Sequence, residues 1–181
     1  MKHKDIFVLT IVFWLLIFSG LILYKEFTLQ TGEEVLLKTR PVDPRDLFRG
    51  DYVILRYEIS TLDMDELHVE NGDLNLNERV YVTLELEDGY GMPKKIYSSP
   101  PEEELFIKGT VRHVGNDILM IDYGIESYFV PEGKGRFIEM QSGDDLDVKI
   151  VIDRFGNAVI KDLLIKGEVV DFGSEQNFEE T

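Results

Sequence analysis

Residues 49–59 read RGDYVILRYEI, and this stretch carries the alternating pattern that decides the fold class. In an extended strand, successive side chains point to opposite faces. One face would hold Val53, Leu55, Tyr57 and Ile59, and the other would hold Tyr52, Ile54, Arg56 and Glu58. The first face is apolar and predicts a contact with the core. The second is mixed, and we expect it to be half covered.

Outward from this stretch, most segments show strand patterns separated by turns. We expect strands at residues 35–40, 79–87, 95–97, 105–114, 118–123, 125–130, 147–153 and 158–165. Residues 61–78 form an acidic connection, and residues 131–141 contain one short helix. About seven or eight short strands predict a mainly β protein, built as a sandwich or an open barrel.

The N-terminal segment differs from the rest of the chain. Residues 6–24 (IFVLTIVFWLLIFSGLILY) contain no charged side chain. As a helix this segment would be about 28 Å long, close to the hydrocarbon thickness of a bilayer. A cleaved signal peptide is the alternative, but the apolar run is long for one and lacks a small-x-small cleavage site. We therefore expect one N-terminal transmembrane helix that remains attached, and the absence of cysteine excludes a lipoprotein anchor.

Charge predicts how the chain is oriented. Lys2 and Lys4 precede the apolar segment, whereas acids dominate after Lys25, so the positive-inside rule places the N-terminus in the cytoplasm. Beyond residue 30 the chain has 16 basic and 33 acidic side chains, which give a net charge of −17. Such a surface repels phosphate backbones, and we expect no nucleic-acid partner.

The predicted organisation has three parts. Residues 1–30 form a membrane anchor and stem, residues 31–173 form an extracytoplasmic β domain, and residues 174–181 form an acidic tail. The predicted location is the cell membrane, with a single pass. Because its apolar positions alternate rather than run continuously, we expect the β domain to fold alone as a soluble monomer.

Two blocks resemble a known family: DPRDLFRGDYVILRYEI (43–59) and YGIESYFVPEGKGRFIE (123–139) are similar to the GDYXXLXY protein family. The resemblance covers most of residues 35–166. It implies bacterial proteins with one N-terminal membrane helix, an outside domain and no established activity, often encoded near polytopic membrane proteins. The motif residues expected to have a structural or binding role are Gly50, Asp51, Tyr52, Leu55, Tyr57, Glu126, Tyr128, Phe129, Pro131, Glu132 and Gly133.

The first block allows a structural and a binding interpretation. Gly50 permits a backbone angle that other residues avoid, and Asp51 can fix the turn before the strand. The ring of Tyr57 suits a core, with a hydroxyl group that needs a partner. We favour this structural interpretation over a binding role for Asp51, Tyr52 and Arg56. The embedded Arg-Gly-Asp tripeptide runs into a strand, which argues against an adhesion signal.

Other candidate sites have weaker patterns. Gly133 and Gly135 could form an anion-binding nest, but they match no phosphate-binding fingerprint, and we expect a structural corner. Glu126 and Glu132 could act as an acid–base pair, but we favour the interpretation that they are surface carboxylates. Residues 63–73 contain five acids without EF-hand spacing, because His68 occupies the glycine position. The three histidines are scattered, so no metal site and no cofactor are predicted.

A serine–lysine hydrolase is the enzymatic alternative, because signal peptidases are also anchored β proteins. Ser98, Ser99, Lys94 and Lys95 lie on one short segment, and the Ser-Met-x-Pro box of those enzymes is missing. We therefore expect a non-enzymatic β domain that binds a neighbouring integral membrane protein. The alternatives are an extracytoplasmic sensor of a ligand or cation, and third, an envelope hydrolase.

Overall fold

The structure is a computed structural model that describes residues 3–40, 52–65, 67, 69–70, 74–115, 117–131, 134–140 and 145–173. Four residues of the predicted motif, Gly50, Asp51, Glu132 and Gly133, lie outside the described residues. So do Glu66, His68 and Asp73 of the acidic connection, and the predicted acidic tail at 174–181.

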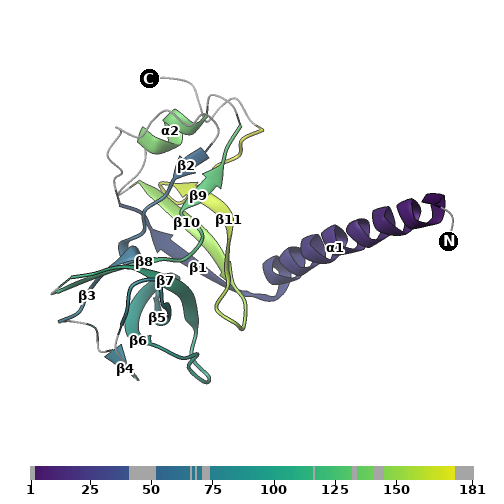
Figure 1. Cartoon of the computed structure of the whole chain (residues 1–181). Helices are drawn as coiled ribbons and strands as arrows, with labels where there is room; N and C mark the ends of the chain where they lie inside the picture. Colours follow the sequence, from purple (N-terminus) through teal and green to yellow (C-terminus); the bar gives the residue numbers. More distant parts are fainter. Residues whose placement is uncertain are drawn as a thin grey trace.

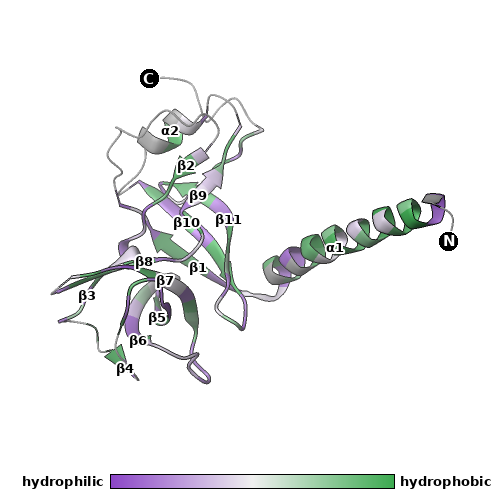
Figure 2. Ribbon diagram, in the orientation of Figure 1, coloured by the Kyte–Doolittle hydropathy of each residue, from purple (hydrophilic) through white to green (hydrophobic). Residues whose placement is uncertain are grey.

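Helix α1 (His3–Thr31) is longer than the predicted span and extends away from the β strands (Figure 1). No residue of its most apolar window is buried against the rest of the protein, and the mean hydropathy of that window is 2.8. Hydrophilic residues gather toward the two ends of the helix (Figure 2). One helix of the described chain is therefore long and apolar enough to cross a membrane, as the sequence predicts.

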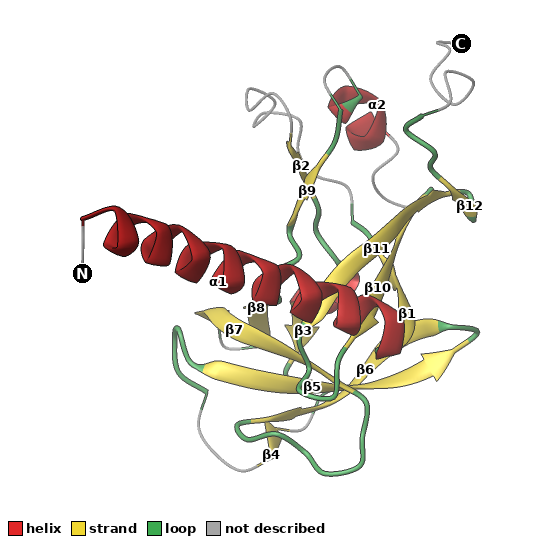
Figure 3. Cartoon of the chain, turned by 90° about the vertical axis from the view of Figure 1, so that its right-hand side faces the viewer, coloured by secondary structure: helices red, strands yellow, loops and turns green. Residues whose placement is uncertain are grey.

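The β strands confirm the predicted fold class. Ten strands form one sheet in the order β12-β11-β10-β1-β6-β5-β7-β8-β3, and β4 pairs with β6 beside this path. The sheet curls without closing into a barrel (Figures 1 and 3). Its strands are β1 (Glu33–Lys38), β3 (Thr61–Asp63), β4 (Val69–Glu70), β5 (Arg79–Glu87), β6 (Tyr90–Tyr97), β7 (Phe106–Val114), β8 (Ile118–Asp122), β10 (Leu146–Ile152), β11 (Ala158–Ile165) and β12 (Glu168–Val169).

Strand β1 joins two parts of this sheet, one formed by β10, β11 and β12 and the other beginning with β6. It pairs along its whole length with β10, in antiparallel register from Glu33↔Ile152 to Lys38↔Asp147. On its other side it meets β6 at Leu36↔Tyr90, where the Leu36 N–H donates to the Gly89 carbonyl at 2.9 Å. One core cluster nevertheless runs through both parts, because side chains such as Val35, Val82 and Ile150 all belong to it.

A second, two-stranded sheet stands apart from the main one. Strand β2 (Tyr52–Ile54) pairs with β9 (Ser127–Phe129), and helix α2 (Gly135–Met140) lies beside them (Figures 1 and 3). We call β2, β9 and α2, together with the adjoining residues 55–57, 123–126 and 130–131, the ribbon unit. Its inner side chains Val53, Val130 and Ile138 are fully buried and belong to the common core.

The opening stretch departs from its prediction in two respects. Its apolar face is buried as expected, but the strand stops at Ile54, and residues Glu58–Ser60 form a short 3-10 helix (η2). The chain exchanges partners there: the Leu55 N–H donates to the Glu126 carbonyl, and Tyr57 bridges to Thr39. The opposite face is exposed rather than half covered.

Candidate functional site

The two family-like blocks are brought together in the ribbon unit. Tyr52 lies opposite Phe129, Val53 opposite Tyr128, and Ile54 opposite Ser127. The Leu55 N–H then donates to the Glu126 carbonyl at 2.8 Å, which extends the pairing by one residue. Segments more than 70 residues apart in the sequence therefore build one local structure.

Two buried tyrosines hold these segments to each other. The Tyr57 hydroxyl donates to the Ile125 carbonyl at 2.6 Å, and the Tyr123 hydroxyl donates to the Ile59 carbonyl at 2.7 Å. Tyr57 lies on the first segment and bonds the backbone of the second, whereas Tyr123 lies on the second segment and bonds the backbone of the first. The two hydrogen bonds therefore connect the segments in opposite directions. Buried carbonyl groups that would otherwise lack a partner are satisfied in this way. The predicted core role of Tyr57 matches this arrangement.

Glu126 organises the turn between the tyrosine bonds. Its carboxylate accepts hydrogen bonds from the backbone N–H groups of Tyr123 and Gly124, and Gly124 adopts a φ of 80°. Burial raises the pKa of both Tyr57 and Tyr123, and the nearby negative charge of Glu126 raises it further. Both tyrosines therefore stay neutral, and the Glu126 carboxylate is engaged in turn structure.

The outer face of the ribbon unit has a different character. Tyr52 and Phe129 are 57% and 61% exposed, and the centroids of their rings lie 5.5 Å apart in an edge-to-face arrangement. Ile54, on the same face of β2, is 39% exposed. Two exposed aromatic rings side by side form the surface that we call the ring pair. Tyr52 and Phe129 were both expected among the motif residues, and Tyr52 is more exposed than the half-covered face predicted for it.

The other predicted motif residues have mixed positions. Leu55 is buried in the core, and Pro131 is exposed after the end of β9. Tyr128 is half-buried, and its ring lies 6.3 Å from that of Phe172. Sequence reasoning missed Tyr123, although it opens the second block, because its hydroxyl partner lies 64 residues away.

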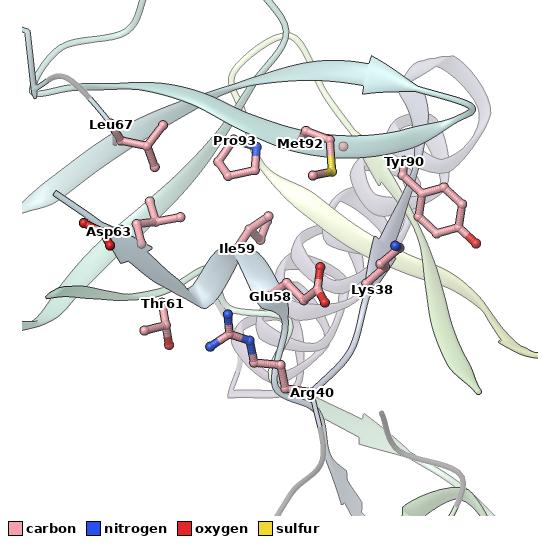
Figure 4. Close-up of a pocket in the computed structure, with 12 residues that line it drawn as sticks. Lys38, Arg40, Glu58, Ile59, Thr61, Asp63, Leu67, Tyr90, Met92 and Pro93 are labelled. Carbon is pink, nitrogen blue, oxygen red and sulfur yellow. The ribbon is translucent and has the colours of Figure 1, made fainter. Parts of the chain in front are cut away.

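A small pocket lies at the opposite end of the opening stretch, between η2, β3 and the start of β6 (Figure 4). Its volume is about 230 Å³, and its lining includes the apolar side chains of Ile59, Leu62 and Met92. The charged ends of Lys38, Arg40 and Glu58 lie around its rim (Figure 4). Such a rim can hold opposite charges of one small ligand.

The lysines of the hydrolase alternative are both paired with acids. Lys95 donates to Glu70 at 2.7 Å, and Lys94 lies 3.1 Å from Glu85. The hydrogen bond to Glu70 raises the pKa of Lys95, whereas a lysine that activates a serine needs a lowered pKa. This pairing opposes a role as general base.

The acidic connection contains two short strands, β3 and β4, rather than one loop. Within the part that the structure describes, the Asp63 carboxylate accepts from the Asp65 N–H at 2.9 Å, and Glu70 is engaged by Lys95. No group of three or more metal-binding side chains occurs among the described residues.

Comparison with known proteins returned one family. The family model described as GDYXXLXY protein matches residues 14–163, which include most of α1 and all of the ribbon unit. No curated protein and no solved structure matches the chain.

Proposed function

The chain belongs to the GDYXXLXY protein family, and from this premise we propose that it is a membrane-anchored, extracytoplasmic β domain that docks against an integral membrane protein. In this proposal α1 is an uncleaved anchor with its N-terminus in the cytoplasm, and the protein acts without catalysis. The motif blocks build the docking surface.

The ring pair is the observation that carries the proposal. The buried motif residues Leu55 and Tyr57 are explained by packing and hydrogen bonding, whereas Tyr52 and Phe129 are each more than half exposed. Aromatic residues are enriched at protein interfaces, where they bury a large area at a small entropic cost. A motif position that packing does not require is best explained by a partner.

The anchor supports the choice of an integral membrane protein as the partner. A domain confined beside the bilayer meets other membrane proteins at a high effective concentration, so a weak contact becomes occupied without any additional interaction. Helix α1 itself offers no obvious small-xxx-small motif for specific helix association. Recognition is therefore assigned to the β domain.

Site-specific photocrosslinking in native membranes tests this proposal. A photoreactive amino acid at position 52 or 129 should form an adduct with a protein that resists carbonate extraction. The matched control is position 76, because Leu76 is 60% exposed and Phe129 is 61% exposed. Equal adducts at all three positions, or none at positions 52 and 129, would contradict docking through the ring pair.

The orientation has a separate test. The Thr31→Cys variant places the chain's single cysteine at the end of α1. A membrane-impermeant maleimide should label it in intact spheroplasts. Labelling that requires lysis would reverse the orientation, and a mature chain lacking residues 1–20 would show a cleaved signal.

The pocket in Figure 4 favours a second candidate function, a sensor of a small zwitterion. Arg40 could take a carboxylate, and Glu58 could take an ammonium group. The volume of about 230 Å³ is below the ~300–1,000 Å³ typical of ligand sites, so we rank this function second. A thermal-shift screen with amino acids tests it, since a ligand stabilises the folded state according to its occupancy.

A further inference from the structure

The turn between β10 and β11 lies beside the end of the membrane helix. Helix α1 ends at Thr31 and β1 begins at Glu33, so one residue links them. Glu33 is paired with Ile152, and β10 runs antiparallel to β1, so the chain returns to the end of α1 as it enters the turn at 153–157. Thr31, Gly32 and Arg154 line one common crevice.

The end of α1 also lies against this hairpin, close to both β10 and β11. Lys161 of β11 forms an ion pair with Glu34, two residues after the linker. The one-residue linker and the packing of the end of α1 against β10 and β11 limit how far the domain can swing about the end of α1. The turn therefore keeps a defined position relative to the helix.

The turn itself is built rigidly. The Asp153 carboxylate accepts from the backbone N–H groups of Phe155 and Asn157, each at 2.8 Å. Gly156 has a φ of 77°, and its carbonyl accepts from the Lys108 N–H at 2.8 Å. A Cβ atom at Gly156 would lie 2.5 Å from the Phe106 ring, so the turn packs closely against β7.

This rigid turn nevertheless displays an aromatic ring. Phe155 is 53% exposed, and the Arg154 guanidinium lies 4.7 Å from the centre of its ring. The Asp153 carboxylate is engaged by the backbone of the turn, and the two exposed side chains of the turn are those of Arg154 and Phe155, one cation and one apolar ring. Side chains of these two kinds are typical of segments that enter the interface of a bilayer.

The length of α1 places the turn at the correct depth. The uncharged segment ends at Tyr24, and seven further helical residues reach Thr31, a rise of about 10 Å. The headgroup region on each side of a bilayer is about 5–8 Å thick. A turn beside Thr31 is therefore within side-chain reach of the headgroups.

We propose that Arg154 and Phe155 form a lipid contact, with the guanidinium on a headgroup phosphate and the ring in the headgroup layer. This inference rests on the proposed anchoring of α1. Glu33, Glu103 and Glu104 line the same crevice as Arg154, and their negative charge repels phosphate groups there, which confines the contact to the tip of the turn. The contact fixes the orientation of the β domain relative to the membrane, and thereby the height of the ring pair above the membrane.

The test uses the full chain, one copy per nanodisc of phosphatidylcholine with phosphatidylglycerol. Trp14 is the single tryptophan, so Phe155→Trp is placed in a Trp14→Phe background. The matched control is Ile118→Trp: Ile118 is 46% exposed and begins β8, beside the end of β7 at Val114, which lies about 20 Å from Lys108 along the strand. Depth-dependent quenching by headgroup nitroxide lipids and by aqueous acrylamide is then measured.

We expect the Phe155→Trp indole to be quenched by the headgroup nitroxide, and to be severalfold less accessible to acrylamide than the Ile118→Trp indole. Adding Arg154→Gln should weaken the nitroxide quenching. A chain that co-elutes with nanodiscs but shows equal quenching at both positions would overturn the lipid contact and leave the anchor intact. A chain that fails to enter nanodiscs would overturn both. Protection that requires added membrane protein would assign the turn to a protein partner and overturn the inference.

Discussion

The ribbon unit and the centre of the main sheet are both antiparallel structures, but they are held together differently. Strand β5 is paired on both sides, with β6 from Tyr81 to Glu87 and with β7 from Arg79 to Thr83. Strand β2 pairs with β9 from Tyr52 to Ile54. Strand β5 is therefore held by backbone pairing along most of its length, whereas the ribbon unit depends on a few side chains.

The difference explains why the motif residues are concentrated in the ribbon unit. A short ladder contributes few hydrogen bonds, and an isolated two-stranded sheet is marginal in water. The crossed bonds of Tyr57 and Tyr123, and the turn built by Glu126, compensate for this. Because the ribbon is held from its inner side, its outer face remains available for the ring pair.

The largest expected effect is at the buried ring of the ribbon unit. Tyr57 is fully buried, so Tyr57→Ala should lower the free energy of unfolding by about 3–5 kcal/mol, as for other large aromatic truncations. Urea denaturation of the β domain measures this loss. A variant that unfolds at the wild-type urea concentration would show that the ribbon unit does not depend on this tyrosine.

A change in the main sheet should have a somewhat smaller effect. A Cβ atom at Gly109 of β7 would lie 2.2 Å from the Ile121 Cγ2 atom, so Gly109→Ala should cost about 3 kcal/mol through overpacking. The double variant with Ile121→Ala relieves this contact, and the two losses should be less than additive. Additive losses in urea melts would place the strain elsewhere.

The tyrosine hydroxyls should contribute less than the rings. Tyr57→Phe and Tyr123→Phe each leave a buried carbonyl without its donor, which should cost about 1–2 kcal/mol apiece. The bonds connect the same two segments, so a double-mutant cycle should show coupling between them. Independent losses would contradict the crossed arrangement.

The same pair predicts a pH dependence. Burial raises the pKa of both tyrosines, so the folded state retains protons that the unfolded state loses above its tyrosine pKa of 10.0. This contribution to stability is complete below that pH and declines as the pH rises above it. The Tyr57→Phe/Tyr123→Phe variant should show a flatter decline between about pH 9 and pH 11 in urea melts. Parallel curves would mean that the hydroxyls titrate similarly in both states.

Local patterns in the sequence predict much of the main sheet. Strand β5 has the predicted bounds, residues 79–87, which its alternating pattern indicated. Strands β7, β8, β10 and β11 begin and end within one or two residues of their predicted bounds. Strand β6 begins at Tyr90 rather than Lys95, because a bulge beside Pro93 lets the ladder continue past the proline. The short strands β3, β4 and β12 were missed because they are too short to show a period.

The candidate site was less predictable. The alternation of Val53, Leu55 and Tyr57 correctly gives the buried face, because burial follows side-chain direction. The pairing of β2 with β9 depends on a partner about 75 residues away, which no local pattern encodes. For the same reason the exposure of the ring pair could not be predicted: it depends on which segments cover the outer face.

The smallest expected effect on stability belongs to the ring pair, and it gives the most direct test of the proposed function. The Tyr52→Ser/Phe129→Ser variant removes two exposed rings, so its free energy of unfolding should stay within about 1 kcal/mol of the wild type. Crosslinking of this variant in native membranes, from a photoreactive residue at position 54, should lose the integral membrane protein that the wild type captures from that position. Undiminished capture by a stably folded variant would contradict docking through the ring pair.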